Sequence, residues 1–192
     1  MSAAAKPYFK VRRSKVHGMG AFATRRIRKG TRVCEYLGER VSHAEADRRY
    51  DSKAEDDNHT FLFIVDRGIV IDGGVDGNES RFINHGCDPN CESVIENRRV
   101  FVEAVRTIQA GEELKYDYSI GRADDDPENV DEIYACRCGA DTCRGTMLWP
   151  AKRPKKRAAK QGGRHATHHA HELMAKKKAA GKRAAKKRAV KK

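Results

Sequence analysis

Three cysteines near position 140 have the spacing of a metal-binding site. They form the run Cys136-x-Cys138-x4-Cys143. Thiols this close along the chain cannot pair comfortably with one another as disulfides, whereas thiolates spaced in this way can bind one metal ion together. Unligated surface thiols are the alternative. Zinc is the metal that favours such a set, and tetrahedral zinc needs a fourth ligand that the run itself does not contain.

Two further pairs of residues could bind a ligand or could be purely structural. Gly18 and Gly20 could form a loop that lets backbone groups approach a ligand closely, or they could form only a tight turn. Asn84 and His85 could contact a ligand, or they could satisfy buried backbone groups at a turn ahead of Pro89. Neither pair decides between these interpretations alone.

A third pair is aromatic. Tyr116 and Tyr118 end the segment Glu113-Leu-Lys-Tyr-Asp-Tyr118, about thirty residues after the Asn-His pair. By themselves they could be core residues whose hydroxyl groups reach the surface. Their meaning depends on the segments around them.

Five short segments, in this order, resemble the landmarks of SET-domain protein lysine methyltransferases. The segments are Gly18-Met-Gly20, Tyr36-Leu-Gly38-Glu39, Arg81-Phe-Ile-Asn-His-Gly-Cys-Asp-Pro-Asn90, Glu113-Leu-Lys-Tyr-Asp-Tyr118 and Cys136-x-Cys138-x4-Cys143. The resemblance covers residues 8–149 and depends most on the third and fourth segments, the paired signature segments of the family. It implies a fold of several small sheets in which the two signature segments thread past one another in a knot-like crossing.

The resemblance implies a binding site for S-adenosylmethionine. In the family the glycine loop brings backbone groups against the cofactor, Asn84 bonds the amino-acid end of the cofactor, and His85 donates from its backbone and holds the crossing together. A sulfonium compound that carries an ammonium, a carboxylate and an adenine requires mixed polar and flat apolar contacts. The cofactor-binding residues that it implies are His17, Gly18, Met19, Gly20, Arg81, Phe82, Asn84, His85 and Trp149.

The resemblance also places Tyr36, Tyr116 and Tyr118 around a narrow channel in which the substrate lysine meets the methyl group. A lysine amine has a pKa near ~10.4 in water and attacks carbon only when neutral, and a desolvated channel beside a sulfonium favours loss of the proton. Tyr118 is the residue that orients the amine and polarises the methyl group. Tyr116 stands where family members carry Tyr or Phe, and its hydroxyl implies monomethylation. Phe61 departs from the Tyr that close relatives often have, so one hydrogen bond expected near the site is missing.

The family pattern places the fourth zinc ligand in the first signature segment, at Cys87. Cys91 is the competing ligand, although its spacing does not match the motif. Zinc held by Cys87 and the three later cysteines would pin the C-terminal strip over the cofactor pocket, so that residues 147–149 cover the adenine and the substrate lysine. Cys34 stands in an apolar run and is expected to be an inert core thiol.

Composition divides the chain near residue 150. Residues 151–192 contain 17 Lys or Arg and one acid, Glu172, a net charge of +16, whereas residues 1–150 carry −3 and every Cys and aromatic residue. A segment without aromatic residues that repeats Lys and Ala is typical of disorder. We therefore expect a SET domain over residues 1–121, a linker and post-SET zinc-binding strip over 122–150, and a disordered basic tail over 151–192.

Short apolar runs predict a mainly β body with little helix. The runs predicted as strands are Tyr8–Val11, Thr31–Leu37, Thr60–Val65, Ile69–Ile71, Val94–Ile95 and Val100–Val105. Residues 97–99 predict a hairpin turn between the last two. Ser42-His-Ala-Glu45 has the pattern of a capping box and predicts a helix to about Tyr50, and residues 79–83 predict one more turn of helix. Residues 121–131 have the composition of a linker.

These patterns predict a protein-lysine N-methyltransferase that acts on a Lys-rich protein, such as a histone, a histone-like protein or the chain itself. The slightly acidic body suits a basic substrate, and the tail should bind DNA or RNA without sequence preference. The alternative is a DNA-binding chromatin-type protein whose SET body is a non-catalytic binding module. The sequence has no run of about 18 apolar residues and no secretory signal pattern. We therefore expect no membrane partner and a place inside the cell, at a nucleoid or at a nucleus, a host nucleus included.

Overall fold

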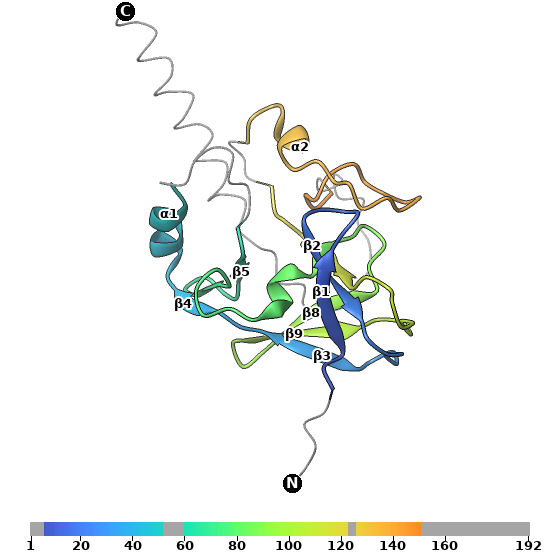
Figure 1. Ribbon diagram of the computed structural model, residues 1–192. Coiled ribbons are helices and arrows are strands. Elements are labelled where there is room, and N and C mark those ends of the chain that lie inside the picture. Colours follow the sequence, from blue (N-terminus) through green and yellow to red (C-terminus); the bar gives the residue numbers. More distant parts are fainter. Residues whose placement is uncertain (1–5, 52–59, 123–125, 151–192) are drawn as a thin grey trace, which may run out of the picture.

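The computed structural model describes residues 6–51, 60–122 and 126–150. The tail, residues 151–192, lies outside the described residues, and so do the predictions of its disorder and of its binding to nucleic acid. Within the described ranges the chain forms ten short strands, two α-helices and one turn of 3-10 helix (Figure 1). The prediction of a mainly β fold with little helix is confirmed.

The strands form four small sheets, three antiparallel and one parallel. The sheets are β1 (Phe9–Arg13) with β2 (Met19–Ala23); β3 (Arg32–Tyr36), β9 (Arg99–Ala104) and β8 (Cys91–Glu96); β4 (Glu39–Val41), β6 (Val70–Asp72) and β5 (Leu62–Ile64); and β7 (Asn84–His85) with β10 (Lys115–Tyr116). The helical segments are α1 (His43–Asp51), η1 (Glu79–Phe82) and α2 (Val130–Ile133).

All six predicted strands are present, as β1, β3, β5, β6, β8 and β9. The sequence missed the other four. β4, β7 and β10 have only two or three residues, too few for an alternating pattern to show. β2 was missed for another reason, because its residues are mostly Gly and Ala, which are not enriched in strands.

Local hydrogen bonds explain where two of the predicted elements begin and turn. The Ser42 hydroxyl accepts from the Glu45 amide at 3.2 Å and caps α1. The predicted capping box is only half formed, because the Glu45 carboxylate binds Arg48 and Arg49 rather than reaching back to the cap. Between β8 and β9, Asn97 and Arg98 have φ angles of 49° and 62°, the left-handed conformation that a two-residue hairpin of type I′ requires.

The buried apolar residues form three clusters. The largest joins the β1–β2 hairpin to the β3–β9–β8 sheet and includes Ile83, Leu114 and Tyr116 from the signature segments. A second packs α1 against the β4–β6–β5 sheet. The third belongs to the C-terminal strip, residues 126–150, where α2 packs against Leu148; the segment predicted as a linker up to residue 131 therefore ends inside a packed helix. No described helix has the length and apolarity needed to cross a membrane.

Candidate functional site

The two signature segments lie side by side as β7 and β10. In this parallel pair Asn84 lies opposite Lys115 and His85 opposite Tyr116. Two residues on each strand make a short ladder, and the fully buried side chain of Asn90 extends it. Asn90 Oδ1 accepts from the Lys115 amide at 2.8 Å, and Asn90 Nδ2 donates to a backbone carbonyl of the second segment at 2.8 Å. Residues 31 positions apart in the sequence are thereby fixed against each other.

The side-chain amide of Asn84 joins three parts of the chain. Its Nδ2 group donates to the carbonyl oxygens of His17 and Met19, at 3.3 and 3.0 Å, and to Glu113 Oε1 at 2.9 Å. Because all three partners are acceptors, this end of the amide must be the NH2 group. No residue in the described part of the chain donates to Asn84 Oδ1. An acceptor therefore remains available to a ligand that carries N–H or O–H donors.

Glu113 was not singled out from the sequence, although it opens the second signature segment. Its Oε1 accepts from Ser14 Oγ at 2.7 Å as well as from Asn84. A Cβ atom on Gly20 would lie 2.2 Å from this oxygen, so only glycine permits the approach of the carboxylate. Gly18 has a φ of 45° and forms the turn that precedes β2. The two glycines therefore have different roles, and the close approach at Gly20 is to Glu113.

The remaining residues expected to hold a cofactor flank this group. The side chains of His17 and Met19 are exposed at the entrance to β2. Arg81, in η1, donates to the Gly73 carbonyl at 2.9 Å and lies 4.9 Å from the centre of the Phe82 ring. The Arg81 Nε–H group is buried and has no hydrogen-bond partner within the described residues.

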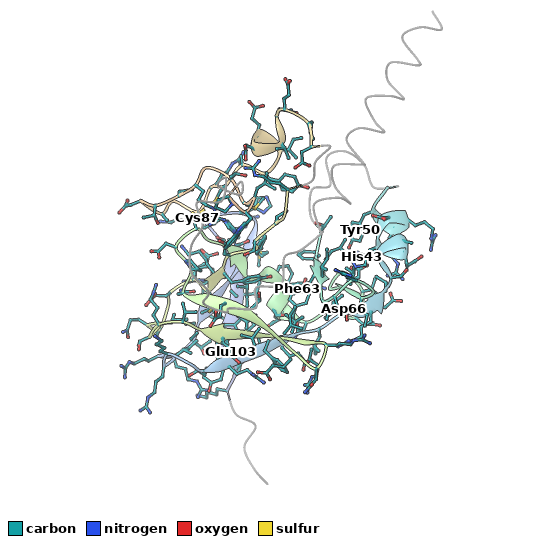
Figure 2. All side chains as sticks on the ribbon, turned by 180° about the vertical axis from the view of Figure 1, so that it is seen from behind. His43, Tyr50, Phe63, Asp66, Cys87 and Glu103 are labelled. Carbon is teal, nitrogen blue, oxygen red and sulfur yellow. The ribbon has the colours of Figure 1, made fainter. Side chains whose placement is uncertain are left out.

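The three tyrosines belong to one continuous aromatic cluster. The rings of Tyr116 and Tyr118 lie 5.1 Å apart, and Phe63 lies between Tyr116 and Tyr36, at 6.4 and 5.5 Å. Figure 2 shows Phe63 near the middle of the molecule. The sequence pointed to Phe61 but not to Phe63, because an apolar residue in a predicted strand gives no sign of its neighbours.

Hydrogen bonds orient two of these tyrosines and leave the third hydroxyl available. Tyr36 donates to the Phe61 carbonyl at 2.7 Å, and Tyr118 donates to the Ile83 carbonyl at 2.9 Å. The Tyr116 hydroxyl makes no hydrogen bond to the residues that the structure describes. Burial raises the pKa of all three phenols, so they are neutral donors and acceptors at physiological pH and none is a ready base.

His85 connects the aromatic cluster to the cysteines. Its Nδ1 accepts from the Tyr118 amide at 3.1 Å, and its Nε2 lies 3.4 Å from Cys87 Sγ. Burial lowers the pKa of His85 to about 4, which agrees with a neutral ring whose Nδ1 carries no proton. The sequence predicted that His85 acts through its backbone. The structure shows that the imidazole also holds the second signature segment in place.

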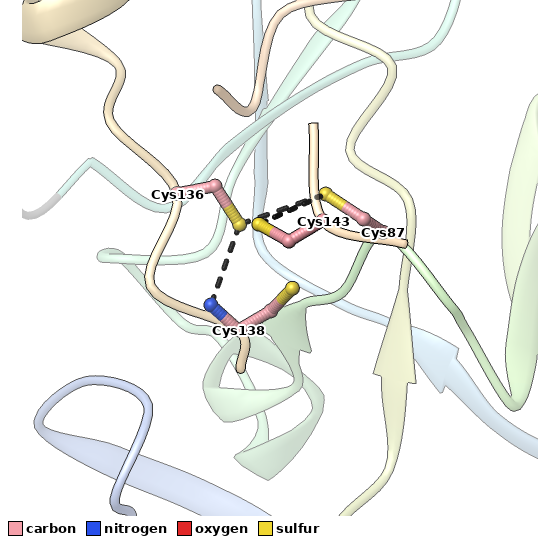
Figure 3. Close-up of side chains that lie close together, drawn as sticks. All are labelled: Cys87, Cys136, Cys138 and Cys143. Carbon is pink, nitrogen blue, oxygen red and sulfur yellow. Dashed lines mark hydrogen bonds between the residues drawn. The ribbon is translucent and has the colours of Figure 1, made fainter. Parts of the chain in front are cut away.

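Four cysteines come together at the far end of this network (Figure 3). The ligand atoms of Cys87, Cys136, Cys138 and Cys143 all lie within 4.8 Å of one another. The Cys87 sulfur is 3.7 Å from that of Cys136 and 3.9 Å from that of Cys143. These separations exceed a disulfide bond and match the distance of about 3.8 Å between sulfurs of a tetrahedron with Zn–S bonds of ~2.3 Å. The donor set therefore fits a tetrahedral thiophilic metal such as zinc.

The other two cysteines lie apart from this group. Cys91 is buried in β8 and Cys34 is half-buried in β3, and burial raises the pKa of each thiol to about 12. Both belong to the main core or pack against it. The structure thus brings Cys87, and not the competing Cys91, to the three later cysteines.

Polar contacts attach the C-terminal strip to the signature segments. Arg144 donates from Nη1 and Nη2 to the two carboxylate oxygens of Asp117, at 2.6 and 2.9 Å. The Trp149 amide donates to the Ile120 carbonyl at 2.7 Å. Trp149 is 44% exposed and remains a candidate to cover a ligand. The prediction that Leu148 shares this task is wrong. Leu148 is wholly buried in the strip's own cluster, because its neighbours Val130 and Tyr134 pack over it.

Comparison with known proteins agrees with this geometry. A family model described as the SET domain matches residues 18–119. The chain is 39% identical over 139 residues to the "Histone-lysine N-methyltransferase, H3 lysine-4 specific" of Schizosaccharomyces pombe, 37% over 146 residues to "Histone-lysine N-methyltransferase trithorax" of Drosophila melanogaster, and 39% over 142 residues to "Histone-lysine N-methyltransferase ash1" of the same fly. These matches cover 70%, 72% and 72% of this chain but only 14%, 4% and 6% of the three relatives.

Proposed function

The chain belongs to the SET-domain family, and from that membership we propose that it is a protein-lysine N-methyltransferase that uses S-adenosylmethionine. The observation that carries the proposal is the parallel pairing of β7 with β10. It joins Asn84, whose Oδ1 is available, to the segment that ends in Tyr116 and Tyr118. A polar acceptor and a buried aromatic wall are what a charged methyl donor and a lysine side chain together require.

The substrate that we propose is a histone or a histone-like Lys-rich protein. The names of the three relatives describe them as histone-lysine methyltransferases, and the net charge of −3 over residues 1–150 suits a basic partner. A chromatin-associated location follows from such a substrate.

The proposed mechanism depends on positioning and desolvation. S-adenosylmethionine, when bound, supplies a methyl group on a sulfonium sulfur, and Asn84 Oδ1 would accept from the ammonium of that molecule. The aromatic cluster excludes water, and a lysine amine loses its proton more easily there than in solution. The Tyr118 hydroxyl is fixed by its bond to the Ile83 carbonyl, and its oxygen lone pairs would orient the amine and polarise the methyl group. Tyr116 supplies an unpaired hydroxyl that can hold the amine or a water.

We further propose that Cys87, Cys136, Cys138 and Cys143 hold a structural zinc ion. Backbone amides support this assignment, since those of Arg144 and Gly145 point at the sulfurs of Cys87 and Cys143, both at 3.4 Å. Such donors stabilise thiolates and orient them around a metal. The ion would fix the strip against the first signature segment, which contributes Cys87.

The domain limits and the role of the tail are proposals that rest on the sequence. We propose a SET domain over residues 1–121, a zinc-binding strip over 122–150 and a nucleic-acid-binding tail over 151–192. The family match at residues 18–119 supports the first limit, and the net charge of +16 supports the last role.

A methyl-transfer assay with labelled cofactor tests the proposed activity. Core histones, ribosomal proteins and the chain itself are the substrates, and we expect label on at least one of them. Tyr118→Phe should lower turnover by about tenfold or more and leave cofactor affinity nearly unchanged, because the hydroxyl acts mainly in the transition state. Tyr8→Phe, far from the cluster along the chain, is the control. Wild-type protein that binds no cofactor and transfers no label would instead support the non-catalytic binding module.

A further inference from the structure

The charge of −3 over residues 1–150 conceals two opposite regions. Residues 6–34 contain ten Lys or Arg and no Asp or Glu, whereas residues 35–150 contain 13 basic and 26 acidic residues, a net −13. The first region comprises the β1–β2 hairpin and the segment that leads from it to β3. We call it the basic face. The acidic region contains the tyrosines and the strip.

The fold holds the cations of the basic face close together and at the surface. Phe9 is buried, so the alternation of β1 turns Lys10 and Arg12 to the opposite side of the hairpin, about 7 Å apart. The next segment is bonded to the start of β1, because the Thr24 amide donates to the Tyr8 carbonyl at 2.9 Å. This segment adds four exposed cations: Arg25, Arg26, Arg28 and Lys29. In Figure 1 the two blue strands and the blue turn below them lie in one region of the molecule.

Two of these cations are held by aromatic rings rather than by acids. The Arg12 guanidinium lies 3.8 Å from the centre of the Phe22 ring, and that of Arg25 lies 4.3 Å from the centre of the Tyr8 ring. Each also donates from Nη2 to a backbone carbonyl, Arg12 to that of Gly111 at 3.2 Å and Arg25 to that of Lys6 at 3.1 Å. Stacking keeps an arginine extended, and the N–H groups that no described residue binds can still donate to a ligand. Such preorganised guanidinium groups suit phosphate, which accepts from two N–H groups at once.

The described ranges of the chain supply few counterions to this face. Within the described residues no acid forms an ion pair with the cations from Lys10 to Lys29. The acidic segment bonded to the hairpin carries Glu112 and Glu113. The Glu112 carboxylate is paired with Arg106 at 2.9 Å, and Glu113 Oε1 accepts from Ser14 Oγ and Asn84 Nδ2 rather than from a cation of this face. Arg32, the first residue of β3, differs from these cations because it forms ion pairs with Glu96 and Glu103. The unpaired cations are therefore available to an external polyanion.

We propose that the basic face binds the phosphate backbone of duplex DNA, without sequence preference. A Lys-rich substrate would be repelled here, whereas DNA packaged by such a substrate would be attracted and would bring the substrate to the acidic region. A membrane surface fits less well. Interfacial binding needs several apolar side chains beside the cations. Of the exposed large apolar residues of the described chain, which are Met19, Leu37, Val75 and Trp149, only Met19 belongs to the basic face, at the start of β2.

The test compares two fourfold variants of the full chain by the salt dependence of DNA binding. The first is Lys10→Gln, Arg26→Gln, Arg28→Gln and Lys29→Gln, whose side chains make no hydrogen bond within the described residues. The matched control is Arg40→Gln, Arg48→Gln, Arg67→Gln and Arg98→Gln, which are exposed and lie around the β4–β6–β5 sheet and the β8–β9 turn. Both variants lose the same net charge and keep the tail, so a general electrostatic effect alters them equally.

Each phosphate contact contributes about 0.9 to the slope of log affinity against log salt concentration. We expect the basic-face variant to lose about 2 to 4 from that slope and at least about tenfold in affinity for a 30-base-pair duplex, while the control changes the slope by less than about 1. Lysine acylation followed by mass spectrometry should show that DNA protects Lys10 and Lys29 in the wild type.

Two outcomes would overturn the proposal. One is equal slopes for the two variants, which would leave the tail as the sole DNA contact. The other is loss of binding to phosphatidylserine vesicles without loss of DNA binding, which would identify a lipid surface as the partner. Methylation of a short peptide should be unchanged in the basic-face variant, since the inference does not depend on the proposed methyl transfer.

Discussion

Among the three tyrosines of the aromatic cluster, Tyr116 is the one whose hydroxyl has no hydrogen-bond partner in the described part of the chain. Tyr36 and Tyr118 both donate to backbone carbonyls, so the positions of their oxygen atoms are fixed. A free hydroxyl next to the methylated amine can hold that amine or a water. Either use takes space that a second methyl group would need.

Tyr116→Phe should therefore shift the products from one methyl group toward two or three on the same lysine. Removing an unpaired hydroxyl leaves no buried partner unsatisfied, so the melting temperature should change little. Mass spectrometry of a modified peptide measures the distribution. A wild-type enzyme that already trimethylates would contradict the role given to Tyr116. The control for a non-specific change in the cluster is Tyr36→Phe, because the Tyr36 hydroxyl is bonded to the Phe61 carbonyl.

Asn84 and Glu113 form a pair whose mutations should behave differently. Asn84→Ala removes the acceptor and should weaken cofactor binding at least about tenfold, measured by calorimetric titration. Glu113→Ala should weaken it less, because Glu113 only orients the amide. Glu113→Gln should be close to wild type, since a single oxygen, Oε1, accepts both hydrogen bonds. Glu112→Ala, which changes the neighbouring half-buried acid paired with Arg106, is the control. Wild-type affinity in Asn84→Ala would remove Asn84 from the site.

These residue roles divide into those that the sequence could predict and those that it could not. The motif spacing pointed to Asn84, the tyrosines and Cys87, because the resemblance fixes their positions. Glu113 was missed because its partner Ser14 lies 99 positions away, and nothing in a local pattern reports such a contact.

At the scale of elements, the strip is joined to the β10 segment by a side-chain clasp. Arg144 lies directly after a cysteine of the metal group, and Asp117 lies between the two tyrosines of the second signature segment. Their two hydrogen bonds are partly buried, with side-chain exposures of 22% and 19%. The clasp thus couples the position of the strip to the position of the tyrosines.

Arg144→Ala should loosen this coupling without removing the metal ligands. Loss of charged hydrogen bonds costs about 1–3 kcal/mol and leaves the Asp117 carboxylate half-buried and without its main partner. We expect normal metal content, faster amide hydrogen exchange over residues 140–149 and a raised KM for a peptide substrate. Arg137→Ala, an exposed cation between two of the cysteines, is the matched control. Loss of metal in Arg144→Ala would show that the clasp supports the cysteine group itself.

Whether an element could be predicted depended on the branched and aromatic residues in and around it more than on its length: five-residue β2, rich in Gly and Ala, was missed, whereas three-residue β5 and β6 lie in longer apolar runs. Runs such as β3 and β9 have enough branched and aromatic residues to be predicted as strands from the sequence. Two-residue strands such as β7 exist only because the other signature segment lies beside them, which is a property of the tertiary structure. The helix at residues 130–133 was hidden for the same reason, since packing against Leu148 stabilises it within a polar stretch.

At the scale of the whole molecule, the described chain is a body with a separately packed strip, and Cys87 is the one proposed metal ligand that the body contributes. The strip has its own small apolar cluster, and three buried residues alone give it little independent stability. The Arg144 clasp, the Ile120 contacts, the four sulfurs and the bonds from Arg122 to Asp131 and to the Trp149 carbonyl attach it to the body. A metal ion there should thus stabilise the strip much more than the body.

Removal of the metal tests this division. The chain should contain one zinc ion, and Cys→Ser at position 87, 136, 138 or 143 should abolish its binding, whereas Cys91→Ser and Cys34→Ser should retain it. Chelation should speed hydrogen exchange over residues 130–149 and leave the β3–β9–β8 sheet protected. It should also make four thiols per chain reactive to alkylation at pH 8, because the loosened strip exposes them to solvent. Cys34 and Cys91 remain with the core, where burial raises the pKa of each to about 12.

The pH dependence of the same site has a definite sign. Metal binding requires thiolates, so protons compete with the ion and apparent affinity should fall as the pH is lowered. The strip should therefore loosen at acidic pH at a metal concentration that keeps it closed at neutral pH, and added zinc should restore it. Hydrogen exchange at two zinc concentrations measures the shift. If the strip loosens equally at both concentrations, protonation acts elsewhere, and the cysteine group does not hold the strip through a metal.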